Sequence, residues 1–169
     1  MFESPENDTI KLIDLGLALV NEKKEISLSR RGSLFYMAPE MIKGNFNHKI
    51  DIWSAGVLFY LLVTGMPPYC GEKFDPQKGY FIHHKTLTEM ILEGKVNYDL
   101  PIFDHLSSEV KNIIRAMLTV DYSNRPEARD ILRSPWFKSQ SLKNVDLNSS
   151  REVCLIGSYG RSLQQLASV

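Results

Sequence analysis

The chain has 169 residues, 43% of them hydrophobic, with 20 basic and 20 acidic side chains. That length suits one domain with a core of its own, and zero formal net charge gives no general reason to expect nucleic acid or an anionic membrane as partner. The longest apolar run, 57–63, is too short to span a bilayer, and no signal-peptide pattern is present. Cys70 and Cys154 lack metal-binding spacing, so we interpret them as reduced thiols of a cytoplasmic protein.

The N-terminal part is predicted to be a small β-hairpin followed by a loop. Residues 9–14 have the alternation of a strand, and the turn-forming residues 4–8 before them make Met1-Phe2 the end of a preceding strand. Residues 19–34 are polar and have no period, which predicts a loop long enough to suggest a function.

The rest of the chain, as far as residue 137, is predicted to be helical. A short helix begins at Pro39 and is closed by Gly44, and a longer one covers 51–64. The longer helix is apolar on nearly every face, so we expect it to be buried on all sides.

Three further helices are indicated by their end signals. One begins with the capping box Thr86 to Glu89 and ends at Gly94. The next is opened by Ser107 or Ser108, and the last lies between Pro126 and Pro135. The predicted fold class is therefore mainly α with a small β-hairpin.

Several motifs then follow one another in a characteristic order. Asp14-Leu15-Gly16 precedes "GSLFYMAPE" (32–40), "DIWSAGV" (51–57), "GMPPY" (65–69) and the run from "IIRAMLTVDYSNRP" to "SPWF" (113–137). Together they resemble the second half of a eukaryotic protein kinase domain, the C-lobe, over residues 1–137. The runs 93–103 and 106–118 are more similar to calmodulin-regulated and calcium-dependent serine/threonine kinases than to tyrosine kinases. Residues 138–169 are then a tail: either a polar end or the start of a regulatory helix, with Leu155, Leu163 and Leu166.

The resemblance implies a role for Asp14 as the magnesium-binding and ATP-binding aspartate. A hard cation that bridges ATP phosphates needs a charged oxygen ligand, and Asp14 follows the predicted strand. The alternative is an ordinary turn aspartate. Leu15 stands where the family usually has Phe, which leaves an apolar side chain but no ring for the packing switch.

The loop before the second motif matches the activation segment of the family. Ser29 lies three positions before Gly32, where many relatives carry a phosphate that pairs with basic residues. Ser33 matches the hydroxyl residue of the peptide-positioning loop and favours the serine/threonine class, and Tyr36 belongs to the same segment. The alternative is that these serines are only solvated loop residues.

Three further matches are structural. The resemblance implies an ion pair between Glu40 and Arg125, and a role for Asp51 in capping its helix and holding the catalytic loop, with a plain helix cap as the alternative. Trp53 is expected in the core.

The catalytic apparatus of the family is not found in these residues. No Gly-x-Gly-x-x-Gly, Val-Ala-x-Lys or His-Arg-Asp occurs, nor any Asp-x-Asp-x-Asp-Gly calcium loop, so we expect this chain to be inactive alone and to bind neither ATP nor Mg²⁺ tightly. Relative to the family, the sequence starts about two residues after the metal-binding Asn. The uncovered side of the apolar helix is then expected to be exposed and prone to association.

Three interpretations remain open. The chain is part of a serine/threonine kinase that phosphorylates protein substrates, a non-catalytic kinase-like module that binds other proteins, or a half that completes a kinase with an N-terminal kinase fragment.

Overall fold

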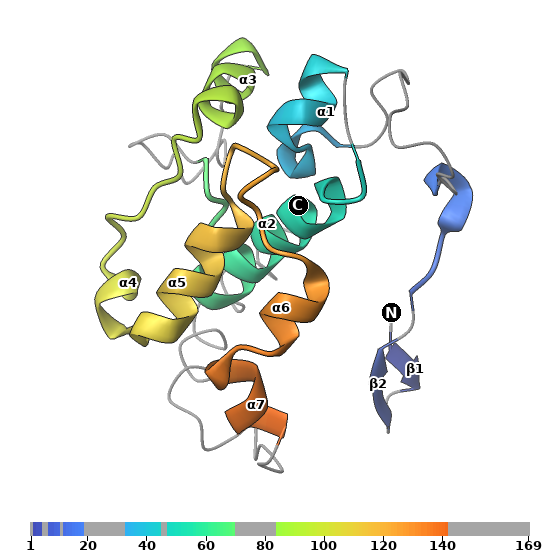
Figure 1. Cartoon of the computed structure of the whole chain (residues 1–169), viewed down its shortest axis with the longest axis vertical. Helices are drawn as coiled ribbons and strands as arrows, with labels where there is room; N and C mark the ends of the chain where they lie inside the picture. The colour runs from blue at the N-terminus through green and yellow to red at the C-terminus, as the bar shows by residue number, and fades with distance from the viewer. Residues whose placement is uncertain are drawn as a thin grey trace, which may run out of the picture.

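The computed structural model describes residues 2–4, 7–10, 12–18, 33–44, 47–69 and 84–141. This part of the chain is mostly helical, with α2 in the middle of the helices (Figure 1). The elements in chain order are β1 (Phe2–Ser4), β2 (Asn7–Ile10), the 3-10 turns η1 (Leu15–Leu17) and η2 (Leu34–Tyr36), α1 (Pro39–Lys43), α2 (Ile50–Thr64), α3 (His84–Glu93), α4 (Ile102–His105), α5 (Ser108–Met117), α6 (Ala128–Leu132) and α7 (Pro135–Ser141).

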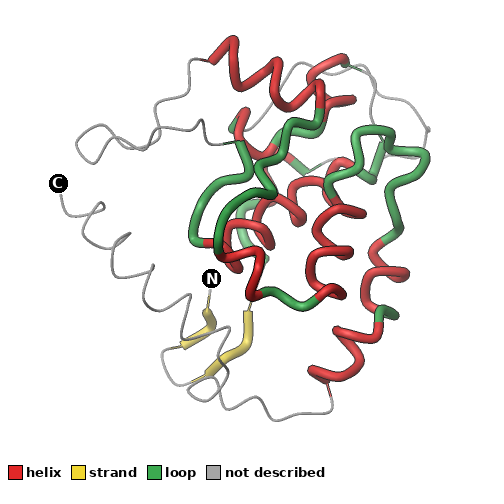
Figure 2. The backbone as a smooth tube through the Cα atoms, turned by 90° about the vertical axis from the view of Figure 1, so that its left-hand side faces the viewer, coloured by secondary structure: helices red, strands yellow, loops and turns green. Residues whose placement is uncertain are grey.

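The two strands form an antiparallel pair at the edge of the molecule (Figures 1 and 2). Phe2 lies opposite Ile10 and Ser4 opposite Asn7, with an irregularity between these pairs. The strand predicted over 9–14 is displaced, because β2 ends at Ile10, which lies opposite Phe2, the first residue of β1. Asp14 therefore lies beyond the strand pair and begins η1 instead.

Helix α2 carries the centre of the core. Trp53, Val57 and Tyr60 are each at most 1% exposed. Gly56 lets α5 approach closely, since a Cβ at this position would lie 2.8 Å from the Cβ of Met117. Little room is left between the two helices, so α2 and α5 pack in close contact at this position.

One face of α2 is not buried. Leu58 is 48% exposed and Leu62 is 51% exposed, and Ala55 is exposed beside them. The prediction that this helix is buried on all sides is therefore wrong for this face, whereas the predicted exposed apolar strip is confirmed.

Within the described ranges, no helix is long and apolar enough to cross a membrane.

The ends of several helices follow their predicted signals. Gly44 and Gly94 both have positive φ, 90° and 67°, as expected for glycines that close α1 and α3. The hydroxyl of Ser107 accepts a hydrogen bond of 3.3 Å from the backbone N–H of Val110, so Ser107 caps α5.

The predicted starts of α3 and α6 are wrong. Helix α3 begins at His84, which places Thr86 inside the helix rather than at its cap. Helix α6 begins at Ala128 with Glu127 as its cap, so Pro126 lies before the helix. The Asp130 carboxylate accepts a hydrogen bond of 3.3 Å from the Glu127 backbone N–H, and this local bond sets the later start.

Helix α7 has no counterpart in the sequence-based prediction. Its aromatic residues Trp136 and Phe137 pack against Phe59 of α2, with ring centroids 5.6 and 6.3 Å from the Phe59 ring. The short helix follows directly from Pro135 at its first position.

Candidate functional site

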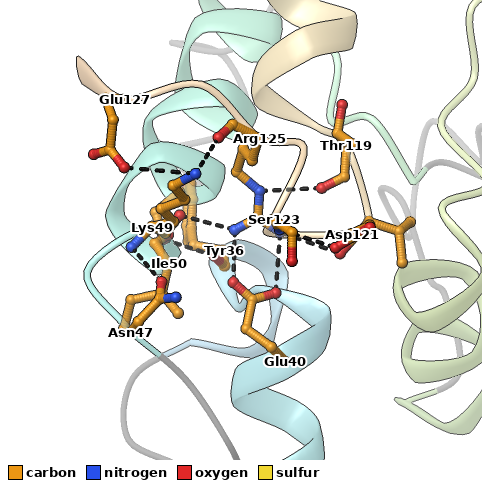
Figure 3. Close-up of polar contacts among 12 residues, drawn as sticks. Tyr36, Glu40, Asn47, Lys49, Ile50, Thr119, Asp121, Ser123, Arg125 and Glu127 are labelled. Carbon is orange, nitrogen blue, oxygen red and sulfur yellow. Dashed lines mark hydrogen bonds and ion pairs between the residues drawn. The ribbon is translucent and has the colours of Figure 1, made fainter. Parts of the chain in front are cut away.

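A buried ion pair joins Glu40, in the first turn of α1, to Arg125, in the connection between α5 and α6 (Figure 3). The two Arg125 terminal nitrogens donate to the two Glu40 carboxylate oxygens over 2.6 and 3.0 Å. Glu40 is 5% exposed and Arg125 is 1% exposed. This bidentate geometry is the strong form of a charge-assisted hydrogen bond.

The remaining donors of Arg125 are also used. Nε donates to the Thr119 carbonyl over 3.0 Å, and the terminal nitrogens reach the carbonyls of Lys49 at 2.8 Å and Val120 at 3.4 Å. The guanidinium carbon lies 5.0 Å from the centroid of the Trp53 ring. Arg125 therefore links α1, the start of α2 and the end of α5. The carboxylate, the carbonyls and the Trp53 ring around it compensate the cost of burying its positive charge.

Three further charged or titratable side chains extend this cluster: the largely buried Lys49 and the more exposed His48 and Glu127. Lys49 donates from Nζ to the Arg125 carbonyl over 2.6 Å and lies 3.5 Å from a Glu127 carboxylate oxygen. His48 Nε2 lies 2.9 Å from the other Glu127 carboxylate oxygen. The hydrogen bond with His48 lowers the pKa of the Glu127 carboxyl group, opposed by its partial desolvation.

The segment 33–38 lies directly before the anchored helix α1. The Tyr36 carbonyl accepts a hydrogen bond of 2.8 Å from the hydroxyl of Ser54 on α2. Met37 and Ala38 are buried, whereas Ser33 and Tyr36 are exposed. The segment thus has a fixed inner side and an outer side that presents one serine and one tyrosine to solvent.

Asp14 is an exposed residue at the start of η1. It has left-handed backbone angles, φ 59° and ψ 71°, and its carboxylate accepts a hydrogen bond of 3.3 Å from the Gly16 backbone N–H. An exposed carboxylate fits one ligand of a magnesium ion. Among the described residues, no group of three or more His, Cys, Asp or Glu side chains could hold a metal ion.

Of the other predicted site residues, Asp51 and Trp53 lie in α2, whereas Ser29 and Gly32 are not among the described residues. Asp51 lies in the first turn of α2 and is exposed, but the cap position is Lys49, so the prediction that Asp51 is the helix cap is wrong. The helix starts one residue earlier than expected because His48 and Asn47 form a turn that leads into it. Trp53 is fully buried.

Sequence reasoning missed two features of this region. One is the role of Lys49: its backbone carbonyl accepts a hydrogen bond from the Arg125 side chain, and its own side chain donates one to the Arg125 carbonyl. No sequence motif indicates a contact with a backbone carbonyl. The other is a pair of stacked rings, Trp53 and Tyr69, with centroids 6.4 Å apart. The Trp53 Nε1 and the Tyr69 hydroxyl are buried with no hydrogen-bond partner among the described residues, and burial raises the pKa of Tyr69 well above its ordinary value.

Comparison with known proteins gives one consistent result. The protein kinase domain family matches residues 1–137. Calcium-dependent protein kinase 29 of Arabidopsis thaliana is 33% identical over 150 residues, which cover 89% of this chain and 26% of that protein. Calcium-dependent protein kinase 3 of Plasmodium yoelii yoelii is 34% identical over 140 residues, which cover 82% of this chain and 24% of that protein. The chain therefore spans about a quarter of the length of these curated relatives.

Proposed function

Because this chain belongs to the protein kinase domain family over residues 1–137, we propose that it forms part of the C-lobe of an ATP-dependent serine/threonine kinase acting on protein substrates. The observation that carries this proposal is the buried Glu40–Arg125 pair, which anchors the chain directly after residues 33–38. An anchored segment with an exposed outer side can hold an extended peptide in register. In this proposal Ser33 and Tyr36 face the substrate.

Asp14 is proposed as one magnesium ligand of the complete domain, with β1 and β2 as the hairpin before it. Magnesium-bound ATP supplies the phosphoryl group, and the metal neutralises charge on the phosphates. The exposed position of Asp14 supports this role, since its carboxylate accepts only a local backbone hydrogen bond among the described residues.

The 169 residues alone are not expected to transfer phosphate. They contain no His-Arg-Asp motif, and phosphoryl transfer depends almost entirely on positioning and charge neutralisation by several groups together. In this proposal the catalytic groups that the 169 residues lack come from additional polypeptide. Reading the transcript for an in-frame His-Arg-Asp followed by Asn tests whether they are encoded with this chain.

We propose a cytoplasmic location for this enzyme.

A chimaeric kinase tests the proposal. Residues 1–137 replace the matching segment of the Arabidopsis calcium-dependent protein kinase 29, and phosphate transfer to serine and threonine peptides is measured. The chimaera should be active, and Asp14→Asn should lower its rate by at least about a hundredfold, since metal stabilisation of the transition state amounts to several kcal/mol.

Asp104→Asn is the matched control, because Asp104 is an exposed aspartate on α4, away from the site. It should leave the rate unchanged. A folded chimaera without activity, or one indifferent to Asp14→Asn, contradicts the proposal.

The second candidate is a non-catalytic kinase-like module that binds other proteins. The exposed leucines Leu58 and Leu62 on α2 favour it, because a contiguous apolar face is a common interaction surface. An inactive but well-folded chimaera together with a stable native polypeptide that begins at Met1 would support this candidate over the first.

A further inference from the structure

Ser33 follows two arginines in the sequence. Residues 30–34 are Arg-Arg-Gly-Ser-Leu, so this serine has arginine three and two positions before it and an apolar residue directly after it. The chain has eight arginines, and Arg30 alone is followed three residues later by a serine or threonine. Serine/threonine kinases select their acceptors by the surrounding charges, and arginine pairs strongly with carboxylates of the modifying kinase. The pattern therefore indicates an acceptor for an arginine-directed kinase.

The structure leaves the Ser33 side chain accessible. Ser33 is exposed, has extended backbone angles (φ −72°, ψ 126°) and makes no side-chain hydrogen bond at the start of η2. Ser54 differs, because its hydroxyl donates to the Tyr36 carbonyl. The Ser33 hydroxyl can therefore enter the active site of another enzyme as a nucleophile without losing a bond that holds the fold.

The backbone after Ser33 is held by one short turn. The Tyr36 N–H donates to the Ser33 carbonyl over 3.1 Å, and the Met37 N–H donates to the Leu34 carbonyl over the same distance. Leu34 is only partly buried, whereas Met37 is buried. A single 3-10 turn can open without disturbing the buried residues that follow it. Ser33 and Leu34 can thus enter the cleft of a modifying kinase while α1 stays in place.

We propose that Ser33 is a phosphorylation site for a serine/threonine kinase that recognises arginine before its acceptor, and that the phosphate blocks the substrate-facing side of residues 33–38. In the reaction, the Ser33 hydroxyl oxygen attacks the γ-phosphorus of magnesium-bound ATP. The bond from this phosphorus to the β,γ-bridging oxygen breaks, and ADP leaves. The hydroxyl proton passes to the base of the modifying kinase, and Ser33 keeps the phosphoryl group.

The phosphate changes the outer side of the segment. It replaces a neutral hydroxyl by a group with three acceptor oxygens and a charge of about −1.5 to −2. Met37 and Ala38 are buried on the inner side, so the group lies on the outer side, where Tyr36 is also exposed. Its bulk and charge keep a substrate peptide from lying against the segment in register. This blocking role rests on the proposed function, whereas the modification itself does not.

Phosphate mapping of the full-length chain tests the site. The chain is incubated with Mg²⁺, ATP and a purified arginine-directed serine/threonine kinase, and phosphopeptides are quantified by mass spectrometry. We expect phosphate on Ser33, and Ser33→Ala should abolish its incorporation. Arg30→Gln with Arg31→Gln should lower the initial rate by at least about tenfold, since the charges that guide recognition are lost.

Two matched controls change other exposed residues. Ser123→Ala removes an exposed serine that has no arginine three residues before it, and Arg129→Gln removes an exposed arginine of α6. Neither change should alter the rate. A synthetic peptide of residues 27–37 serves as the fully accessible reference, and circular dichroism checks that all variants are folded.

Three results overturn the site. The first is an unmodified Ser33 in the folded chain while the synthetic peptide is modified, because the fold then withholds the hydroxyl. The second is phosphate on other residues only. The third is a rate of Ser33 modification that does not respond to the change of Arg30 and Arg31.

The chimaeric kinase with residues 1–137 tests the blocking role. Phosphate on Ser33 should lower kcat/KM for a substrate peptide by at least about tenfold, and a serine/threonine phosphatase should restore it. The Ser33→Ala chimaera, compared with its own starting rate, should respond to neither treatment. Unchanged activity of the phosphorylated chimaera overturns the blocking role alone. A chimaera that is inactive before treatment contradicts the proposed function and the blocking role together, while the mapping still decides the site.

Discussion

Replacing Glu40 by glutamine removes one charge of the buried ion pair and leaves the other in place. The Arg125 guanidinium keeps its hydrogen bonds to the carbonyls of Lys49, Thr119 and Val120, but its charge loses the carboxylate that lies 2.6 and 3.0 Å away. Breaking a buried pair by removing one partner costs about 3–5 kcal/mol. Since the carbonyls still solvate Arg125, we expect Glu40→Gln at the lower end, about 3 kcal/mol.

Arg125→Met should cost more, about 5 kcal/mol, because it removes all five of these hydrogen bonds and leaves the Glu40 carboxylate buried without its partner. The double variant Glu40→Leu with Arg125→Met should be less destabilised than the sum of the single changes, since no charge is left unpaired. Total stabilities of single domains are only about 5–15 kcal/mol, so the single changes are large effects.

Urea unfolding of the full chain, followed by tryptophan fluorescence, measures these differences as shifts in the midpoint at constant slope. The matched control is Glu109→Gln, which changes an exposed glutamate on α5. A cost below about 1 kcal/mol for Glu40→Gln would refute the reasoning, because that is the range of an exposed ion pair. Additive costs in the double variant would equally show that the two side chains do not act as a pair.

Three further changes test other parts of the fold. Gly56→Ala should lower the melting temperature, because its Cβ would lie 2.8 Å from the Met117 Cβ and overpacking costs about 1–3 kcal/mol; an unchanged melting temperature in calorimetry would show that α5 can shift. Tyr69→Phe should raise stability or leave it unchanged at neutral pH, since the hydroxyl is buried without a hydrogen-bond partner among the described residues. Burial raises the pKa of the Tyr69 hydroxyl, so the stability that this residue contributes is fully present below the unfolded pKa of 10.0 and is lost as pH rises through the folded pKa. Tyr69→Phe should therefore unfold at a higher alkaline pH than the native chain. Equal alkaline unfolding of the two proteins would contradict this expectation. The hydrogen bond with His48 lowers the pKa of the Glu127 carboxyl group. The stability that Glu127 contributes is therefore present above the ordinary pKa of 4.5 and is lost as pH falls through the lower folded pKa. Melting temperatures of the native chain and of Glu127→Gln should differ near neutral pH and converge in acid.

Local signals in the sequence were sufficient for those helix ends that depend on one residue. Gly44 and Gly94 close their helices because only glycine adopts positive φ without strain, and Ser107 caps α5 with its own hydroxyl. Where two signals compete, the sequence could not decide between them. Thr86 resembles a cap but lies inside α3, and Pro126 resembles a first helical residue but precedes the cap Glu127.

The order and spacing of the motifs determined the family from the sequence alone. Each motif is short, but the chance that all occur in one order within 137 residues is small, and the family match covers the same residues. The pairing of Glu40 with Arg125 was implied by that resemblance and by nothing local, because 85 residues separate the two along the chain.

Tertiary structure alone decided which groups complete the site and which face of α2 is covered. Arg125 is satisfied by backbone carbonyls, and every residue has a carbonyl, so no side-chain pattern marks Lys49 or Thr119 as partners. Helix α2 is apolar on all sides in sequence, and only the positions of α5, α7 and η2 around it leave Leu58 and Leu62 exposed. Composition determines that a helix can be buried, whereas the number and placement of its neighbours determine which side remains open.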